Sequence, residues 1–349
     1  MAAVRNIYEQ QAYNKRMTAV IVAIFIALLA LLGYAIDTLL LGIPSDEIPL
    51  PIMTLITTCL AIGSTIWGLN SGWKIVLKSS GACRLNPKDP LHKQLLNVVE
   101  EMKIAAGTPM PAVFIIHDCD FNALTTGRDP QHSAIAVTDS LLNAVSREEL
   151  QGIIAHEMSH IRNYDIRLTT VLASVVGAVV LLAESILGLF KEMMKSPSDE
   201  ERTAWHSDAY RERVHNSMEA KVVFAPLYAI VWLIDKVIAS LILKLMATAV
   251  SRSREYLADS TAAELTRNPA GLASALKKIG SDRIPTMSIK AATAHMCIVD
   301  PAGNGFNDRE GFLAELFGTH PPLLKRIKKL EAMAYQIRPN IRNAPQVPS

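Results

Sequence analysis

Residues 146–160 read SREELQGIIAHEMSH and combine a helix start with a metal-binding pattern. Ser146, followed three residues later by a glutamate, is typical of a capping box that opens a helix. The apolar residues after it continue a helical pattern as far as His156. On such a helix His156 and His160 lie one turn apart on the same face, and Glu157 lies beside them. The HExxH spacing therefore predicts a helix that holds a metal ion.

A third ligand has to come from another part of the chain, because two imidazoles alone do not complete a zinc site. Residues 251–265, SRSREYLADSTAAEL, carry Glu255 and Asp259 four residues apart on one face of a second helix. We expect Glu255 to be the third ligand of a Zn²⁺ ion and Asp259 to accept a hydrogen bond from a ligand imidazole. The alternative is that both motifs are solvated charges on surface helices, but their presence in one chain favours the metal site.

The composition excludes several classes of protein. Of the 349 residues, 50% are apolar and only 19% are charged, whereas about a quarter are charged in a typical globular protein. Disordered, fibrous and nucleic-acid-coating proteins do not have this balance. The formal net charge of +2 gives no basic field for a polyanion, so we expect no nucleic-acid partner. The four cysteines form no CxxC pair, which argues against disulfides and thiolate zinc sites and favours a reducing compartment.

A long apolar run near the N-terminus predicts a first membrane span. Twenty uncharged residues lie between Arg16 and Asp37, and as a helix they would cover the roughly 30 Å of a bilayer's hydrocarbon core. A cleaved signal peptide is the alternative, but its apolar core is shorter, about 7 to 15 residues, and ends at a small-residue site that this run lacks. We therefore expect this run to remain as a transmembrane helix.

A second uncharged run, Ile48 to Trp73, predicts a helix that crosses back. Trp67 and Trp73 lie toward its end, where amphipathic rings favour the membrane interface. Basic residues precede the first run and follow the second, whereas the loop between the runs carries only acidic charges. By the positive-inside rule, the N-terminus and the residues after 74 face the cytoplasm.

Two weaker apolar stretches, 168–190 and 222–243, are also long enough to cross a membrane. They contain Glu184, Asp235 and Lys236, which would be costly against lipid and should pair or line a wet cavity. A helical hairpin that lies in the interface without crossing is the alternative. We expect crossing, about four transmembrane helices in all, and an even number of crossings keeps both metal motifs in one compartment.

Between the apolar runs the sequence predicts a small soluble fold. Residues 90–106 place apolar side chains on one face of an amphipathic helix that Gly107 ends. Residues 112–116 (AVFII) and 133–139 (SAIAVTD) predict buried strands, and residues 121–130 (FNALTTGRDP) predict a turn-rich connection between them. The expected fold class is α+β, mostly helical, with a small β-sheet.

Taken together, the motifs resemble those of a known family. HExxH and the later ExxxD surround a hydrophobic hairpin, NALTTG at 122–127 precedes them, and GTHPPLLKRI at 318–327 follows. In this order they are similar to the HtpX-type membrane zinc metalloproteases, relatives of the CAAX prenyl proteases, over about residues 18–334. The resemblance implies an integral membrane protein with a zincin-like metalloprotease domain. The expected divisions are an N-terminal transmembrane hairpin (1–73), the first part of the protease domain (74–167), a second hydrophobic hairpin (168–250), the second part of the protease domain (251–335) and a tail (336–349).

The resemblance also implies roles for individual residues. Glu157 would be the general base, and His320 and Arg326 would contact the developing oxyanion. One Zn²⁺ per chain would be held by three ligands, namely His156, His160 and Glu255. An edge strand would pair with an extended substrate, and its residues would be Ala134, Ile135, Ala136 and Val137.

We interpret the chain as a membrane-bound zinc endopeptidase in which Glu157 takes a proton from the water that attacks a peptide bond. Pairing of the substrate backbone with a strand accepts many sequences but requires an extended segment. The expected partners are therefore unfolded or membrane-protein polypeptides and the lipid bilayer. The expected setting is quality control of damaged proteins at a bacterial inner membrane, with the catalytic domain facing the cytoplasm. Two alternatives stay open: a membrane zinc-binding or transport protein, and a scaffold that retains zinc only for folding.

Overall fold

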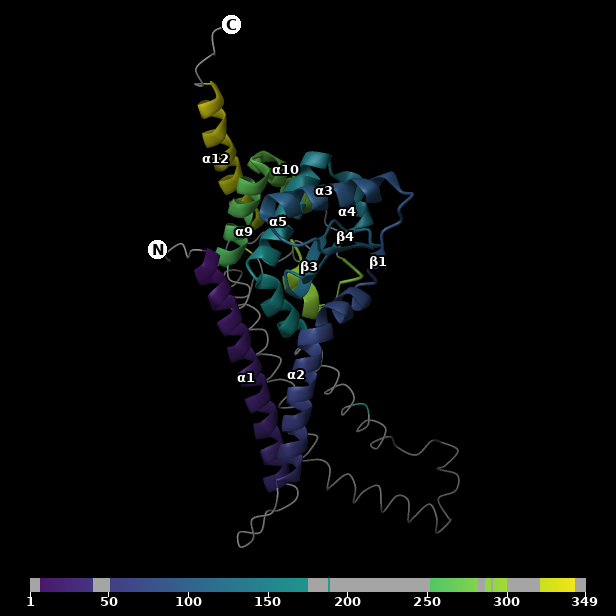
Figure 1. Ribbon diagram of the computed structural model, residues 1–349, viewed down its shortest axis with the longest axis vertical. Coiled ribbons are helices and arrows are strands. Elements are labelled where there is room, and N and C mark those ends of the chain that lie inside the picture. The colour runs from purple at the N-terminus through teal and green to yellow at the C-terminus, as the bar shows by residue number, and fades with distance from the viewer. Residues whose placement is uncertain are drawn as a thin grey trace, which may run out of the picture. The chain divides into compact units, whose positions relative to one another are not determined.

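The computed structural model describes residues 7–39, 51–174, 188, 252–281, 286–289, 291–299 and 321–342. Within these residues the chain is mostly helical with one small mixed sheet, as the sequence predicts (Figure 1). By their contacts the residues form two units, a first unit of 1–23, 65–174 and 245–349 and a second unit of 24–64 and 175–244. Both metal motifs lie in the first unit.

Two helices are long and apolar enough to cross a membrane, α1 (Ile7–Leu39) and α2 (Ile52–Ser79). Many of their large apolar side chains face outward: Leu31, Leu60 and Trp67 are 63%, 58% and 60% exposed. Apolar surface of this extent is stable against lipid rather than against water. The two helices coincide with the two N-terminal spans that the sequence predicts.

The other two expected spans lie mostly outside the described residues, since of 168–190 only 168–174 and 188 are described and of 222–243 none are. Residues 189–251, which include most of the expected second hairpin and the loop 191–221, lie outside the described residues. The same holds for Glu184, Asp235 and Lys236. Four crossings therefore stay a prediction.

The sheet has four strands in the order β1–β2–β4–β3. Their bounds are β1 Cys83–Arg84, β2 Ala112–Ile116, β3 Ala123–Asp129 and β4 His132–Thr138. β2 and β4 are parallel, whereas β1 pairs antiparallel with β2, and β3 pairs antiparallel with β4. The strands predicted at 112–116 and 133–139 are thus confirmed to within one residue.

β3 is a strand that the sequence does not predict. Its polar residues and Gly127 are typical of turns, which is why the sequence indicates only a turn-rich connection over 121–130. In the structure these residues pair with β4, and an added Cβ at Gly127 would lie 2.5 Å from the carbonyl oxygen of His132. Tertiary pairing, not local propensity, determines the conformation of this segment.

β4 is not the edge strand that the resemblance implies. Its residues Ala134–Val137 pair with β2 on one side and with β3 on the other, so both sides of the backbone are used. The four side chains are also fully buried, at 0% exposure. The expectation that this strand receives an extended substrate is therefore wrong. Within the described residues β1 and β3 are the edge strands. Because the sequence does not predict β3 as a strand, it gives no sign that β3 lies beside β4.

Helix α5 (Arg147–Arg162) carries the HExxH motif and passes through the core of the first unit. Its buried side chains pack against three helices, α3 (Pro90–Ala106), α9 (Arg252–Thr266) and α10 (Pro269–Ser281) (Figure 1). The remaining described elements are α4 (Asp139–Ala144), the 3-10 helix η1 (Ala291–Met296) and α12 (Leu323–Arg342). Because α5 is enclosed on several sides, its two histidines have a fixed place in the core.

The N-terminus of α5 is held by the predicted capping box. The Ser146 side chain accepts a hydrogen bond from the Glu149 backbone, and the Glu149 side chain accepts one from the Ser146 backbone. Glu149 also accepts hydrogen bonds of 2.6 Å from Ser274 and from Lys278 on α10. Burial raises the pKa of Glu149, but these hydrogen bonds outweigh burial and lower it. One carboxylate thus caps α5 and attaches it to α10.

The backbones of α5 and α10 also touch directly. An added Cβ at Gly152 would lie 2.7 Å from the nitrogen and 2.8 Å from the Cα of Leu272. An added Cβ at Gly271 would lie 2.8 Å from the Glu148 carbonyl oxygen. Only glycine permits this approach, because the neighbouring atoms are backbone atoms and cannot rotate away.

We predict that Gly152→Ala lowers the free energy of unfolding by about 1–3 kcal/mol through overpacking, although alanine favours a helix by roughly 1 kcal/mol. The matched control is Gly63→Ala on α2, where an added Cβ meets none of the described residues within 4 Å. This control should be as stable as the parent protein or more stable. Thermal unfolding in detergent measures both, and equal stability of the two variants would contradict the close packing of α5 on α10.

Candidate metal centre

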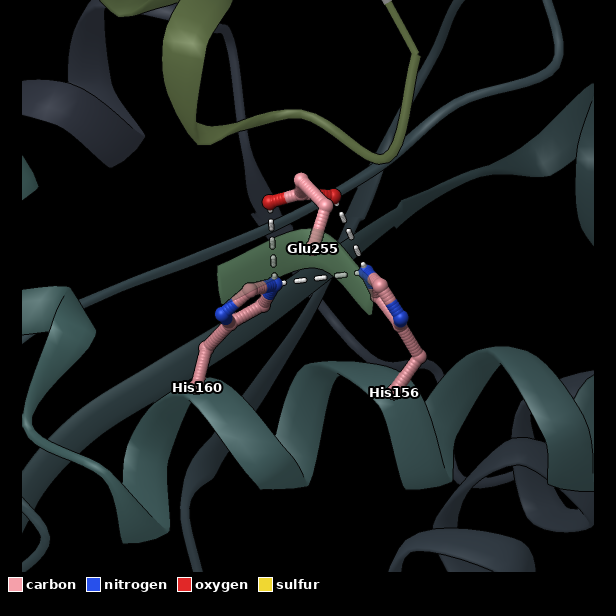
Figure 2. A group of neighbouring side chains, drawn as sticks. All are labelled: His156, His160 and Glu255. Carbon is pink, nitrogen blue, oxygen red and sulfur yellow. Dashed lines mark hydrogen bonds and ion pairs between the residues drawn. The ribbon is translucent and has the colours of Figure 1, made fainter. Parts of the chain in front are cut away.

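Three side chains from two helices face one another in the first unit (Figure 2). His156 and His160 come from α5 and Glu255 comes from α9. The two imidazole Nε2 atoms are 3.2 Å apart, and each lies 3.6 Å from an oxygen of Glu255. His156 and Glu255 are buried and His160 is partly exposed. The structure therefore brings together the three residues that the sequence nominates as ligands.

The other nitrogen of each imidazole faces a carboxylate. His156 Nδ1 lies 3.0 Å from Asp259 Oδ1, in the position expected from the sequence. His160 Nδ1 lies 3.0 Å from Asp165 Oδ2. When each Nδ1 donates its proton to a carboxylate, both Nε2 atoms present lone pairs. Two lone pairs that face each other at this distance favour a cation at the point where they converge.

Asp165 is a functional candidate that the sequence reading missed. It follows His160 by five residues, but helix α5 ends at Arg162, so helical spacing does not predict the contact. A two-residue turn with Tyr164 at φ 59° follows the helix, and Asp165 directly after this turn contacts the histidine. The available signal was chemical: a histidine ligand commonly donates its second N–H to a carboxylate.

The buried charges around the cluster do not balance without a cation. In the described part of the chain, four carboxylates and two guanidinium groups are buried here, namely Glu157, Asp165, Glu255 and Asp259 with Arg254 and Arg326. When all of them are ionised, two negative charges remain. Buried charges need compensation, and a divalent cation supplies this amount. The set of donors and its charge therefore fit a divalent metal ion.

Asp259 is held in its charged form by Arg326. Nε and Nη2 of Arg326 donate to the two oxygens of Asp259 at 2.9 and 2.8 Å, and Nη1 donates to the Ile298 carbonyl at 3.0 Å. Burial raises the pKa of Asp259, but the charge of Arg326 and hydrogen bonds from Arg326 and His156 lower it to about 2. All three nitrogens of the Arg326 guanidinium thus donate to groups of the protein itself. Its contact with the developing oxyanion of a substrate stays a prediction.

The same carboxylates act on His156. Burial by itself lowers the pKa of this imidazole, but hydrogen bonds to Asp259 and Glu255 raise it to about 9. The surroundings therefore favour a positive charge at this ring. A metal ion that binds there displaces the proton.

Glu157 is buried beside the two histidines, at 1% exposure. Its Oε2 accepts a hydrogen bond from the hydroxyl group of Thr125 on β3. β3, the strand that the sequence does not predict, therefore fixes the orientation of Glu157, the candidate general base. Thr125 lies within the NALTTG motif, but the motif alone gives no sign of this contact.

A pocket opens next to the cluster. Its lining includes His160 and Glu255, Thr125 from β3, Thr169 from the helix at 165–174 and Met296 from η1. A ligand in this pocket would lie directly beside the converging imidazole and carboxylate groups. The site can therefore combine a metal ion, a buried carboxylate and room for a substrate.

The remaining candidate residue is His320. His320 is outside the described residues, which resume at Pro321, two positions before α12 begins. Its role stays a prediction. His117 and His132 are exposed and each pairs with a surface aspartate, at 3.0 and 2.7 Å, as expected for histidines that are not ligands.

Comparisons with known proteins agree with these motifs. A family model described as Peptidase family M48 matches residues 90–334. "Protease HtpX homolog" of Thermoanaerobacter pseudethanolicus is 38% identical over 329 residues, which are 94% of this chain and 98% of that protein. "Protease HtpX homolog" of Caldanaerobacter subterraneus subsp. tengcongensis is 37% identical over 330 residues, again 94% of this chain and 98% of that protein. The crystal structure of S. mikatae Ste24p overlaps with a TM-score of 0.44 at 16% identity, over 92% of this chain and 66% of that chain.

The family model covers more than half of the chain and includes both metal motifs. The two HtpX homologues are matched over nearly their whole length. The resemblance drawn from the motifs is thereby confirmed. The chain belongs to peptidase family M48 and is a membrane metalloprotease.

Proposed function

We propose that this metalloprotease is a zinc-dependent endopeptidase with one Zn²⁺ per chain. His156, His160 and Glu255 would hold the ion, and Asp259 and Asp165 would orient the two imidazoles. The observation that carries the proposal is the pair of Nε2 atoms 3.2 Å apart with a carboxylate behind each ring. Two histidines, one glutamate and an open fourth position form a known type of catalytic zinc site. When bound in such a site, Zn²⁺ makes water more acidic and polarises a carbonyl group.

Glu157 would act as the general base. It is buried next to the histidines, and the hydroxyl of Thr125 holds one of its oxygens. From this place the other oxygen can take the proton from a water that attacks the peptide carbonyl, and can return it to the leaving amine. The combination of an HExxH helix and a strand beside the base supports a zincin-like domain.

We further propose that the substrate binds as an extended segment in the pocket beside Thr125, where β3 faces the candidate metal centre. Thr125 of β3 contacts the proposed general base and lines the pocket. The outer side of β3 is itself covered, because Leu124 pairs with Cys297 and the Gly127 N–H donates to Thr170. A substrate in this pocket would therefore present its backbone to the candidate metal centre. A substrate that presents its backbone in this way must be extended, which supports unfolded or damaged membrane-protein polypeptides as substrates, and hence a role in quality control.

The proposed location is a bacterial inner membrane, with the catalytic residues on the cytoplasmic side. The support is the distribution of charged residues around α1 and α2. Basic residues lie before the apolar run of α1 and after the apolar run of α2, and the charged residues between the two runs are all acidic. A membrane zinc-binding or transport protein without proteolysis is not favoured, because such a protein has no need of a buried, oriented Glu157.

The first prediction concerns the general base. Glu157→Gln should lower hydrolysis of an unfolded protein such as casein by roughly 10²- to 10⁴-fold, because the amide cannot accept the proton. Bound zinc should stay near one per chain. The matched control is Glu148→Gln, an exposed position on the same helix, which should leave hydrolysis unchanged. Undiminished cleavage by Glu157→Gln would exclude the mechanism.

The second prediction concerns the third ligand. Glu255→Ala should lose zinc during desalting, because two imidazoles alone hold the ion weakly. Elemental analysis of the purified protein measures this loss. Glu264→Ala is the matched control, since Glu264 is an exposed glutamate on the same helix, α9. Equal zinc content in the two variants would show that Glu255 is not a ligand.

The third prediction concerns the side of the membrane. Cys83 and Cys119 are exposed and follow α2 in the chain. A membrane-impermeant maleimide should label both in inverted vesicles and neither in right-side-out vesicles, because the reagent reaches only the outer surface. Mass spectrometry of the labelled peptides gives the result. Labelling of Cys83 in right-side-out vesicles would refute the cytoplasmic location.

A further inference from the structure

The contact between His160 and Asp165 depends on the turn that follows α5. Helix α5 ends at Arg162, and the next helix begins at Asp165. Between them Tyr164 has φ 59°, a left-handed conformation that is unfavourable for a residue with a large side chain. Such a turn needs support from its surroundings. If it relaxed, Asp165 would move away from His160.

That support comes from the first turns of α1. Gln11 Nε2 and Asn14 Nδ2 each donate a hydrogen bond of 2.9 Å to a backbone carbonyl of the 162–165 turn. Lys15 places its Nζ 4.3 Å from the centre of the Tyr164 ring, within the range of a cation–π contact. One face of α1, just before its apolar run, therefore contacts the turn through three side chains.

Asn14 in addition reaches Asp165 itself. Asn14 Nδ2 donates to Asp165 Oδ1 at 2.6 Å, and Gln10 Nε2 donates to the side-chain oxygen Oδ1 of Asn14 at 3.3 Å, which orients the amide. Asn14 and Asp165 are 1% and 4% exposed. Arg254, next to Glu255 on α9, lies 3.6 Å from the same Asp165 oxygen. Asp165 is thus fixed by α1 and α9 on one oxygen and contacts His160 with the other.

We propose that Asn14 is a positioning residue of the metal centre, which acts on His160 through Asp165. The inference rests on the zinc site proposed above. It gives α1 a second role besides membrane anchoring: the zinc site reaches its full affinity only when the N-terminal end of α1 is docked on the 162–165 turn. A chain whose first helix has not docked would hold zinc weakly.

The test is the zinc affinity of the full-length protein in detergent, measured by competition with a chelator. Asn14→Leu should weaken zinc binding by roughly tenfold, at the lower end of the effect of residues that orient metal ligands. It should also change the visible absorption spectrum of the Co²⁺-loaded protein, which reports ligand geometry. The matched control is Thr18→Val, because Thr18 is buried one turn further along α1 and its hydroxyl donates to a backbone oxygen, that of Asn14, at 2.8 Å, rather than to the 162–165 turn. This control should keep the parent affinity and spectrum.

A double-mutant cycle separates positioning from general destabilisation. If Asn14 acts through Asp165, Asn14→Leu should cause little further loss of zinc affinity in a protein that already carries Asp165→Ala. Asn14→Ala replaces Asn14→Leu if the larger side chain prevents folding. Additive losses in the cycle would overturn the proposal, as would parent-like zinc affinity of a folded Asn14 variant. A parent protein that binds zinc but does not cleave casein would instead refute the endopeptidase function and leave this inference standing.

Discussion

Two imidazole nitrogens that face each other 3.2 Å apart in the protein interior are the constraint on which the rest of the site depends. Each ring is held from behind by a buried carboxylate, Asp259 for His156 and Asp165 for His160. The arrangement is unfavourable unless a positive charge occupies the point between the rings and Glu255. Other contacts of the first unit hold these groups in place. The close approach of α5 and α10 at their glycines fixes the helix that carries both histidines, and Arg326 fixes Asp259.

The site is built from segments that are distant in sequence, and each supplies a different function. Helix α5 supplies two proposed ligands and the proposed base, and α9 supplies the third proposed ligand together with Asp259. Strand β3 orients the base through Thr125. The N-terminal end of α1 supports the turn that presents Asp165. A membrane helix and a sheet edge therefore meet at one candidate metal centre, which suits an enzyme whose proposed substrates emerge from the bilayer.

The sequence predicts those parts of the site that follow from local spacing. The i, i+4 pair His156 and His160 and the capping box at Ser146 are helical patterns, so the residues alone reveal them. It does not predict β3 or Asp165, because both are placed by tertiary contacts: β3 by pairing with β4, and Asp165 by a turn with a left-handed Tyr164. The expected substrate strand was wrong for the same reason, since the order of strands in a sheet depends on every strand being identified.

X-ray absorption at the zinc edge of the purified full-length protein tests the central claim most directly. The account predicts one zinc per chain, with two imidazole nitrogens and a carboxylate oxygen at about 2.0–2.2 Å and no sulfur in the coordination sphere. A zinc–sulfur distance of about 2.3 Å, or a spectrum with a single imidazole, would contradict it, because then His156, His160 and Glu255 would not share one ion.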